Sequence, residues 1–143
     1  MTFVLDASVA LTWLLQDASK QDMAYASSVL KALRSSGRHA SVSGIWGLEI
    51  ANVIARGEAQ GQLTEAQSGA FLEMLQAVSI AIDPGTAAQA LADTLQLARR
   101  HSLSSYDASY LELALRLSLP MATLDAKLRR AAGKAGVRVY KPD

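Results

Sequence analysis

Short apolar segments rich in Val, Ile and Leu alternate along this chain with longer segments of helical periodicity. Such alternation is typical of a mostly parallel sheet, because parallel strands must be joined by long crossover connections, usually helices. The predicted strands are residues 2–5, 39–42, 78–82, 121–124 and 137–140. The predicted helices are residues 7–16, 21–35, 44–57, 64–77, 86–100, 105–118 and 126–135. The pattern therefore predicts an α/β fold with a central, mostly parallel, five-stranded sheet flanked by helices.

The length of 143 residues suits one compact domain, and we expect residues 1–143 to form a single unit. No stretch without Asp, Glu, Lys or Arg exceeds ten residues, well short of the roughly 18 residues that a membrane span requires. The first residues, MTFVLD, include an acid and lack the basic start of a secretory signal. We therefore expect a cytoplasmic protein without a membrane-spanning helix.

Four acidic residues stand alone in otherwise uncharged stretches of the chain. Asp6 and Asp125 directly follow predicted strands, and Asp107 lies at the start of a predicted helix. Glu49 lies inside an apolar helix, on a face that it shares with Trp46. A carboxylate among apolar groups is costly unless it is paired or binds a metal. Because ligands of open parallel sheets bind beyond the carboxyl ends of the strands, we expect the four side chains to share one site.

Local explanations for these acids remain open. The acids that follow strands and the acid at a helix start stand where a carboxylate can cap a helix or favour its first turn. Glu49 could be partly exposed, or it could pair with Arg56 or with the basic C-terminal residues. Glu112, by contrast, has Arg116 four residues later and is expected to form a surface ion pair.

The absence of Cys and the presence of only two His restrict the kind of metal site that the chain can form. Disulfides, zinc-thiolate sites, iron-sulfur clusters and thiol nucleophiles are excluded. Clustered carboxylates repel one another, so a shared acidic site favours a divalent cation, and oxygen ligands select Mg²⁺ or Mn²⁺. Such an ion suits phosphodiester hydrolysis. Ser8, Thr123 and Asn52 lie near the acids in sequence and could orient ligands, or could simply cap helices or hydrogen-bond in the core.

Basic residues gather near the C-terminal end of the sequence. Residues 126–142 contain six Lys or Arg and no acid, whereas residues 1–125 contain eight basic and twelve acidic residues. A basic end on an acidic body could steer a polyanion, and Lys127, Arg129 and Arg130 are candidate contacts to RNA phosphates. Alternatively, the charges belong to a solvated last helix and compensate its macrodipole.

Four segments form a motif set that spans nearly the whole chain. FVLDAS at residues 3–8 is an apolar strand that ends in Asp-x-Ser, and EIANV at residues 49–53 contains Glu-x-x-Asn in an apolar helix. SYDASYLELA at residues 105–114 and LPMATLD at residues 119–125 complete the set. In this order and spacing, the segments resemble PIN-domain ribonucleases of the VapC type, which are toxins of toxin-antitoxin pairs. One departure is Ser43-Gly44, because such chains often have Pro before the Glu helix.

The resemblance implies a PIN-like three-layer sandwich and a metal-dependent endoribonuclease that hydrolyses RNA phosphodiester bonds. It implies that Asp6, Glu49, Asp107 and Asp125 form a catalytic site for Mg²⁺ or Mn²⁺. It also implies a tRNA, rRNA or mRNA substrate, inhibition of translation or growth, a cognate antitoxin and a homodimer.

Two other functions remain compatible with the residues. A phosphoryl-transfer hydrolase would use Asp6 as a covalent nucleophile, but such enzymes commonly place a second Asp two residues later, where this chain has Ser8. A non-catalytic regulatory module would bind an ion or accept a phosphoryl group and would act through a protein contact. Cleavage of RNA distinguishes the nuclease from both.

Overall fold

A parallel four-stranded sheet forms the middle of the structure. The computed structural model describes residues 2–35 and 37–142, and the strand order in the sheet is β3-β2-β1-β4. The strands are β1 (Thr2–Leu5), β2 (His39–Val42), β3 (Ile80–Ile82) and β4 (Met121–Ala122). All the pairings are parallel. The carboxyl ends of the strands therefore lie at one edge of the sheet, and we refer to it as the carboxyl edge.

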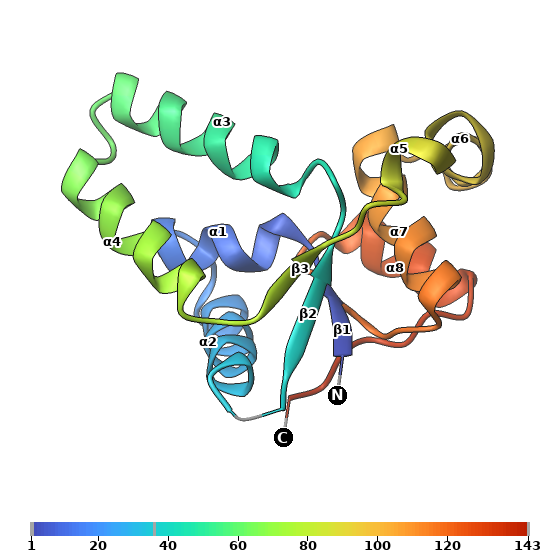
Figure 1. Ribbon diagram of the computed structural model, residues 1–143, viewed down its shortest axis with the longest axis horizontal. Coiled ribbons are helices and arrows are strands. Elements are labelled where there is room, and N and C mark those ends of the chain that lie inside the picture. The colour runs from blue at the N-terminus through green and yellow to red at the C-terminus, as the bar shows by residue number, and fades with distance from the viewer. Residues whose placement is uncertain (1, 36, 143) are drawn as a thin grey trace.

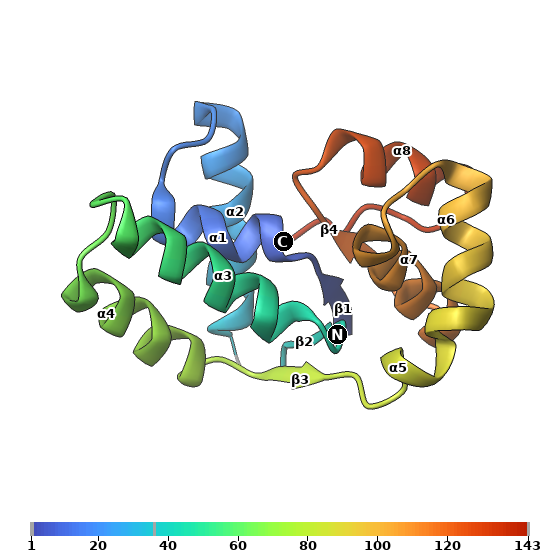
Figure 2. The ribbon, with the colours of Figure 1, turned by 90° about the horizontal axis from the view of Figure 1, so that it is seen from above.

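Helices cover both faces of this sheet, as Figures 1 and 2 show. One layer contains α1 (Ala7–Leu15), α2 (Lys20–Leu33), α3 (Trp46–Ala59) and α4 (Glu65–Gln76). The other contains α5 (Thr86–Gln89), the π-helical segment η1 (Ala90–Thr94), α6 (Leu95–His101), α7 (Ser105–Leu117) and α8 (Ala126–Lys134). The predicted three-layer α/β architecture is confirmed. Within the described ranges, no helix has the length and apolar character needed to cross a membrane.

The apolar composition of β1 follows from its central position. Phe3, Val4 and Leu5 are completely buried, because helices cover the strand on both faces and strands flank it on both sides. A strand in this position reads as a continuous apolar run rather than as an alternating one. The Phe3 ring also stacks on Tyr140, with the ring centroids 3.8 Å apart. The buried central strand thus fixes the position of Asp6, the residue that follows it.

The fifth predicted strand, residues 137–140, is wrong as a full strand. Only an isolated parallel bridge joins Met121 to Val139. The Met121 N–H donates to the Arg138 carbonyl at 2.9 Å, and the Tyr140 N–H donates to the Met121 carbonyl at 2.8 Å. The Pro120 carbonyl accepts from the Val4 N–H at 2.9 Å and so faces β1, on the other side of β4. The pairing with residues 137–140 is confined to the Met121–Val139 pair.

The predicted helix at residues 86–100 is interrupted. Its middle part, η1, has π-helical hydrogen bonding, and Ala92 has φ of −115° and ψ of −109°, outside the helical region. The apolar periodicity of this segment did not indicate the break, because neither Gly nor Pro occurs within it. The other predicted helices are present, with ends that differ by one or two residues.

Candidate functional site

Asp6 lies at the carboxyl edge, directly after β1, and is only 4% exposed. Its Oδ2 accepts hydrogen bonds from Ser8 Oγ at 2.6 Å and from Thr123 Oγ1 at 2.8 Å. Ser8 Oγ in turn accepts from the Leu124 N–H at 2.9 Å, and the Asp6 N–H donates to the Ala122 carbonyl at 3.0 Å. The first strand and the segment after β4, far apart in sequence, together fix this carboxylate.

Glu49 reaches from α3 towards α7. Its Oε1 accepts a hydrogen bond from the Tyr110 hydroxyl at 2.5 Å, and the Tyr110 side chain is completely buried. Burial and the neighbouring Glu49 carboxylate raise the pKa of Tyr110, so its hydroxyl remains protonated and acts as a donor. Among the described residues Glu49 forms no ion pair, so the alternative pairing with Arg56 is not present.

Asp107 and Asp125 lie at the starts of α7 and α8. The Asp107 N–H donates to Ser104 Oγ at 3.1 Å, which caps the helix and leaves the half-buried Asp107 carboxylate in its first turn. Asp125 is itself the N-cap of α8, because its Oδ1 accepts from the Leu128 N–H at 2.8 Å. The local role that the sequence left open for Asp125 is therefore real, and the same residue also lies at the carboxyl edge.

The charges of the four carboxylates affect one another. Burial raises the pKa of Asp6, and the Asp125 charge raises it further. Burial also raises the pKa of Glu49, with smaller contributions from Asp6 and Asp107. The pKa of Asp107 is raised to about 6, first by burial and then by Asp6 and Asp125, while Lys127 opposes the shift. Acids from four separate segments are thus close enough to disfavour one another's ionised forms.

No three His, Asp or Glu side chains within residues 2–35 and 37–142 converge closely enough to hold one metal ion. Asp125 uses Oδ1 to cap a helix, and Glu49 uses Oε1 to accept from Tyr110. The donor set nevertheless has the chemistry for a hard divalent cation, since all the ligands are carboxylates and a cation would relieve their repulsion. Residues and metal therefore fit, and binding requires that the carboxylates move closer together.

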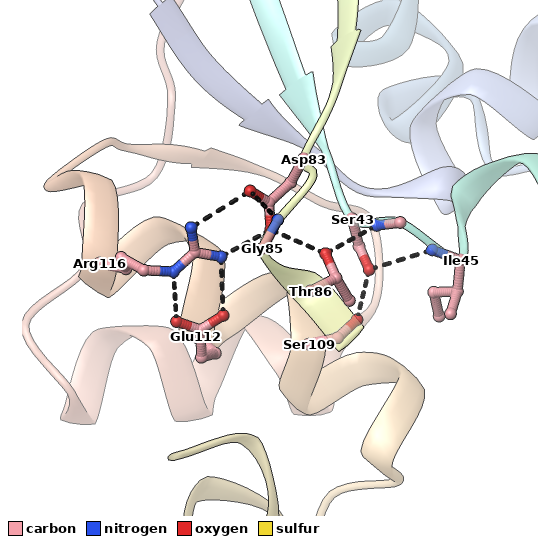
Figure 3. A network of polar contacts seen from close by, with 9 residues as sticks. Ser43, Ile45, Asp83, Gly85, Thr86, Ser109, Glu112 and Arg116 are labelled. Atoms are coloured by element: carbon pink, nitrogen blue, oxygen red, sulfur yellow. Dashed lines mark hydrogen bonds and ion pairs between the residues drawn. The ribbon is translucent and has the colours of Figure 1, made fainter. Parts of the chain in front are cut away.

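A partly buried ion-pair network joins the turn after β3 to α7 (Figure 3). The Arg116 guanidinium donates to Asp83 at 3.1 and 2.6 Å and to Glu112 at 2.7 and 3.0 Å. The side chains of these two acids are 5% and 4% exposed, respectively. Asp83 also accepts from the Gly85 N–H at 3.1 Å and from Thr86 Oγ1 at 2.8 Å. The pairing of Glu112 with Arg116 was predicted, but its surface location was wrong.

Two contacts extend this network to the start of α3 (Figure 3). The Gly44 N–H donates to Thr86 Oγ1 at 2.8 Å, and the buried hydroxyls of Ser43 and Ser109 are 2.7 Å apart. Proline at position 44 would lack the N–H for the first bond, and even a Cβ there would lie 3.1 Å from the Thr86 Cβ. The bond explains the absence of proline, and the close approach of Thr86 favours glycine over a larger residue. The network orients α3 and α7, which carry two of the four carboxylates.

The residues expected to support the acids have different environments. Ser8 and Thr123 contact Asp6 directly, but Asn52 is exposed and forms no hydrogen bond to Glu49 within the described part of the chain. Arg129 Nη2 donates to the Thr123 carbonyl at 2.7 Å, so this cation is engaged beside the site.

Sequence reasoning did not pair Tyr110 with Glu49, although Tyr110 lies one turn after Asp107 on the same helix. That spacing places a phenol on the face of α7 that carries an acid of the site. The Asp83 contact to Arg116 had no such signal, because 33 residues separate the partners.

A parallel sheet between two helical layers, with carboxylates gathered at its carboxyl edge, defines an α/β protein with an acidic candidate active site. The family model described as PIN domain matches residues 3–134. The chain therefore belongs to the PIN domain family, whose members are generally nucleases.

Solved structures share this fold at low sequence identity. PAE2754 from Pyrobaculum aerophilum is 21% identical, with a TM-score of 0.63, over 92% of this chain and 87% of that chain. FitAcB from Neisseria gonorrhoeae is 23% identical, with a TM-score of 0.60, over 99% of this chain and 98% of that chain. No curated protein matches the chain.

Proposed function

We propose that this protein is a Mg²⁺-dependent endoribonuclease, with Mn²⁺ able to substitute, and that it is the toxin of a toxin-antitoxin pair. The observation that carries the proposal is the placement of four carboxylates near the carboxyl edge, close enough that burial and mutual repulsion raise the pKa of three of them. Membership of the PIN domain family supports the nuclease chemistry. The motif resemblance supports the toxin assignment.

The four carboxylates would have two different roles. Asp6, Glu49 and Asp107 would hold the ion, and Asp125 would hold a second ion or a water molecule. When bound, the ion would supply activation of a water nucleophile and neutralise charge on the scissile phosphate. The hydroxyls next to Asp6 and the Tyr110 hydroxyl next to Glu49 orient their carboxylates through the hydrogen bonds described above.

Cleavage of RNA by the purified protein tests the nuclease proposal. The protein, freed of any bound partner, is incubated with total RNA, tRNA and rRNA fragments and mRNA, in Mn²⁺, Mg²⁺ or EDTA. We expect discrete cuts that require the metal and that disappear in Asp6→Asn and Glu49→Gln. Asp17→Asn is the matched control, since it makes the same change at an exposed position outside the site.

Metal binding is measured separately by calorimetry on the same variants. Asp107→Asn should weaken Mn²⁺ binding, whereas Asp17→Asn should not. If Mn²⁺ binds but no RNA is cut under any condition, a non-catalytic binding module replaces the nuclease. If wild type and Asp6→Asn cut alike, the cleavage does not come from this site and the assignment is wrong.

The toxin proposal has its own readouts. Induced expression without a partner should arrest growth, and Asp6→Asn should relieve the arrest. A small protein encoded beside this chain should bind it and block cleavage, and sedimentation should give the mass of a homodimer. Unchanged growth at full expression would count against the toxin role while leaving the nuclease proposal intact.

A further inference from the structure

A basic groove lies between the end of α6 and helix α8. Its volume is about 470 Å³, and no acidic side chain is among the residues that line it. The polar lining residues are Arg100, His101, Ser102, Lys127, Arg130 and Lys134. Figure 2 shows both helices in the same layer of the structure. Four of the lining side chains carry a permanent positive charge.

These charges have no partner in the fold. Within the described ranges, none of the four Lys and Arg side chains forms an ion pair, and all four residues are exposed. A cation in the last turn of α6, such as Arg100, compensates the helix macrodipole. Lys134 has the same favourable position in the last turn of α8. Lys127 instead lies in the first turn of α8, where the macrodipole disfavours a cation, and Arg130 lies in the middle of that helix. The macrodipole therefore does not account for Lys127 and Arg130.

The groove begins at the candidate active site. Lys127 lies in the first turn of α8 and follows Asp125, the N-cap of that helix, by two residues. Lys134 lies at the other end of α8, about 10 Å away at a rise of 1.5 Å per residue. That length is enough only for a short run of successive phosphates on one RNA strand. The groove thus has the charge and length for a short stretch of nucleic-acid backbone leading away from the carboxylates.

We propose that this groove holds consecutive phosphates of the RNA strand that the site cuts, adjacent to the scissile bond. The proposal rests on the proposed function and adds the path of the substrate to it. It assigns this contact to Arg100, His101 and Lys134, as well as to Lys127 and Arg130. Arg129 is not part of the groove lining, since its guanidinium donates to the Thr123 carbonyl instead.

Binding measured without cleavage tests the groove. The parent protein is Asp6→Asn in EDTA, and the probe is a fluorescently labelled single-stranded RNA of mixed sequence. The groove variant adds Arg130→Gln and Lys134→Gln. The matched control adds Lys31→Gln and Arg34→Gln, which remove the same charge from exposed positions at the C-terminal end of α2, in the opposite helical layer. Thermal unfolding confirms that both double variants are folded.

We expect the groove variant to bind the RNA about ten-fold more weakly than the parent at low salt. The slope of log affinity against log salt should fall by about 1.4, because each phosphate contact on a single strand contributes about 0.7. The control should lose much less affinity. Equal losses in the two variants, an unchanged affinity of the groove variant, or no binding by the parent would overturn the proposal.

Cleavage by the same charge variants with Asp6 restored separates the two proposals. If the wild-type protein cuts RNA, and the groove variant binds and cuts RNA as well as the protein without the groove substitutions, the groove proposal fails and the nuclease proposal stands. If Asp6-containing protein cuts no RNA but the groove variant still loses affinity in the binding assay, the groove stands as an RNA site and the nuclease fails.

Discussion

Replacement of Arg116 by Met should destabilise the protein more than any other single surface-accessible charge change. The guanidinium forms four hydrogen bonds to Asp83 and Glu112, whose side chains are at most 5% exposed. Arg116→Met would leave both carboxylates buried without a cation, and breaking a buried pair in this way costs about 3–5 kcal/mol. For a chain of this size, that corresponds to a melting temperature lower by roughly 6–20 °C.

The loss of stability in Arg116→Met should depend on pH. Hydrogen bonding to Arg116 holds the pKa of Asp83 below its usual value. A lowered pKa contributes stability above the unfolded-state value of about 3.9, and that stability is lost as the pH falls through the native value. In Arg116→Met the contribution is absent at every pH. The stability gap between wild type and variant should therefore be widest near pH 7 and should narrow below about pH 4.

Urea unfolding at several pH values measures this gap. Arg116→Lys should give an intermediate loss, because an ammonium keeps the charge but cannot form paired bonds to both acids. Arg34→Met, at an exposed position without an ion pair among the described residues, should change stability by less than about 0.5 kcal/mol. A loss below about 1 kcal/mol at pH 7, or a gap that widens on acidification, would refute the reasoning.

Three other substitutions give separate tests. Thr123→Val removes the buried hydroxyl that donates to Asp6 and should cost about 1–3 kcal/mol in urea unfolding; an unchanged midpoint would contradict this. Tyr110→Phe frees Glu49 from its donor, so RNA cleavage should require more Mn²⁺ while stability falls by only about 1 kcal/mol; an identical metal titration would argue against an orienting role. Tyr106→Ala should weaken binding of single-stranded RNA and leave unfolding unchanged, because this exposed ring beside Asp107 can stack on an unpaired base, and Tyr106→Phe should bind normally.

The sequence was most informative where position along an element determines the environment. Asp6 and Asp125 follow apolar strands, and parallel strands bring such positions to one edge regardless of the loops between them. Glu49 was recognisable because a lone acid in an apolar helix needs a partner. The helices could be predicted from the helical spacing of their apolar residues, because that spacing indicates one buried face on each helix.

Contacts between distant segments could not be predicted in this way. Nothing in the local sequence places Asp83 against Arg116. The pair of Glu112 with Arg116 was expected at the surface, but the Glu112 side chain is buried. The bridge at Met121 and the irregular turn at Ala92 likewise depend on packing and hydrogen bonding beyond the pattern of apolar residues. The partner of Glu49 was missed because a tyrosine three positions after an acid is equally compatible with a core residue.

The position of β1 in the sheet has a consequence for synthesis of the chain. This strand is made before the other described strands, yet one of its two neighbours, β4, and the hydroxyl of Thr123 that holds Asp6 come from residues made more than a hundred positions later. A ribosome-bound chain that ends before Pro120 therefore presents β1 as an open edge and Asp6 without its buried hydroxyl partner. Such non-local pairing is slow to form. The acidic site is consequently completed only after the segment that carries Thr123 and Asp125 has emerged from the ribosome.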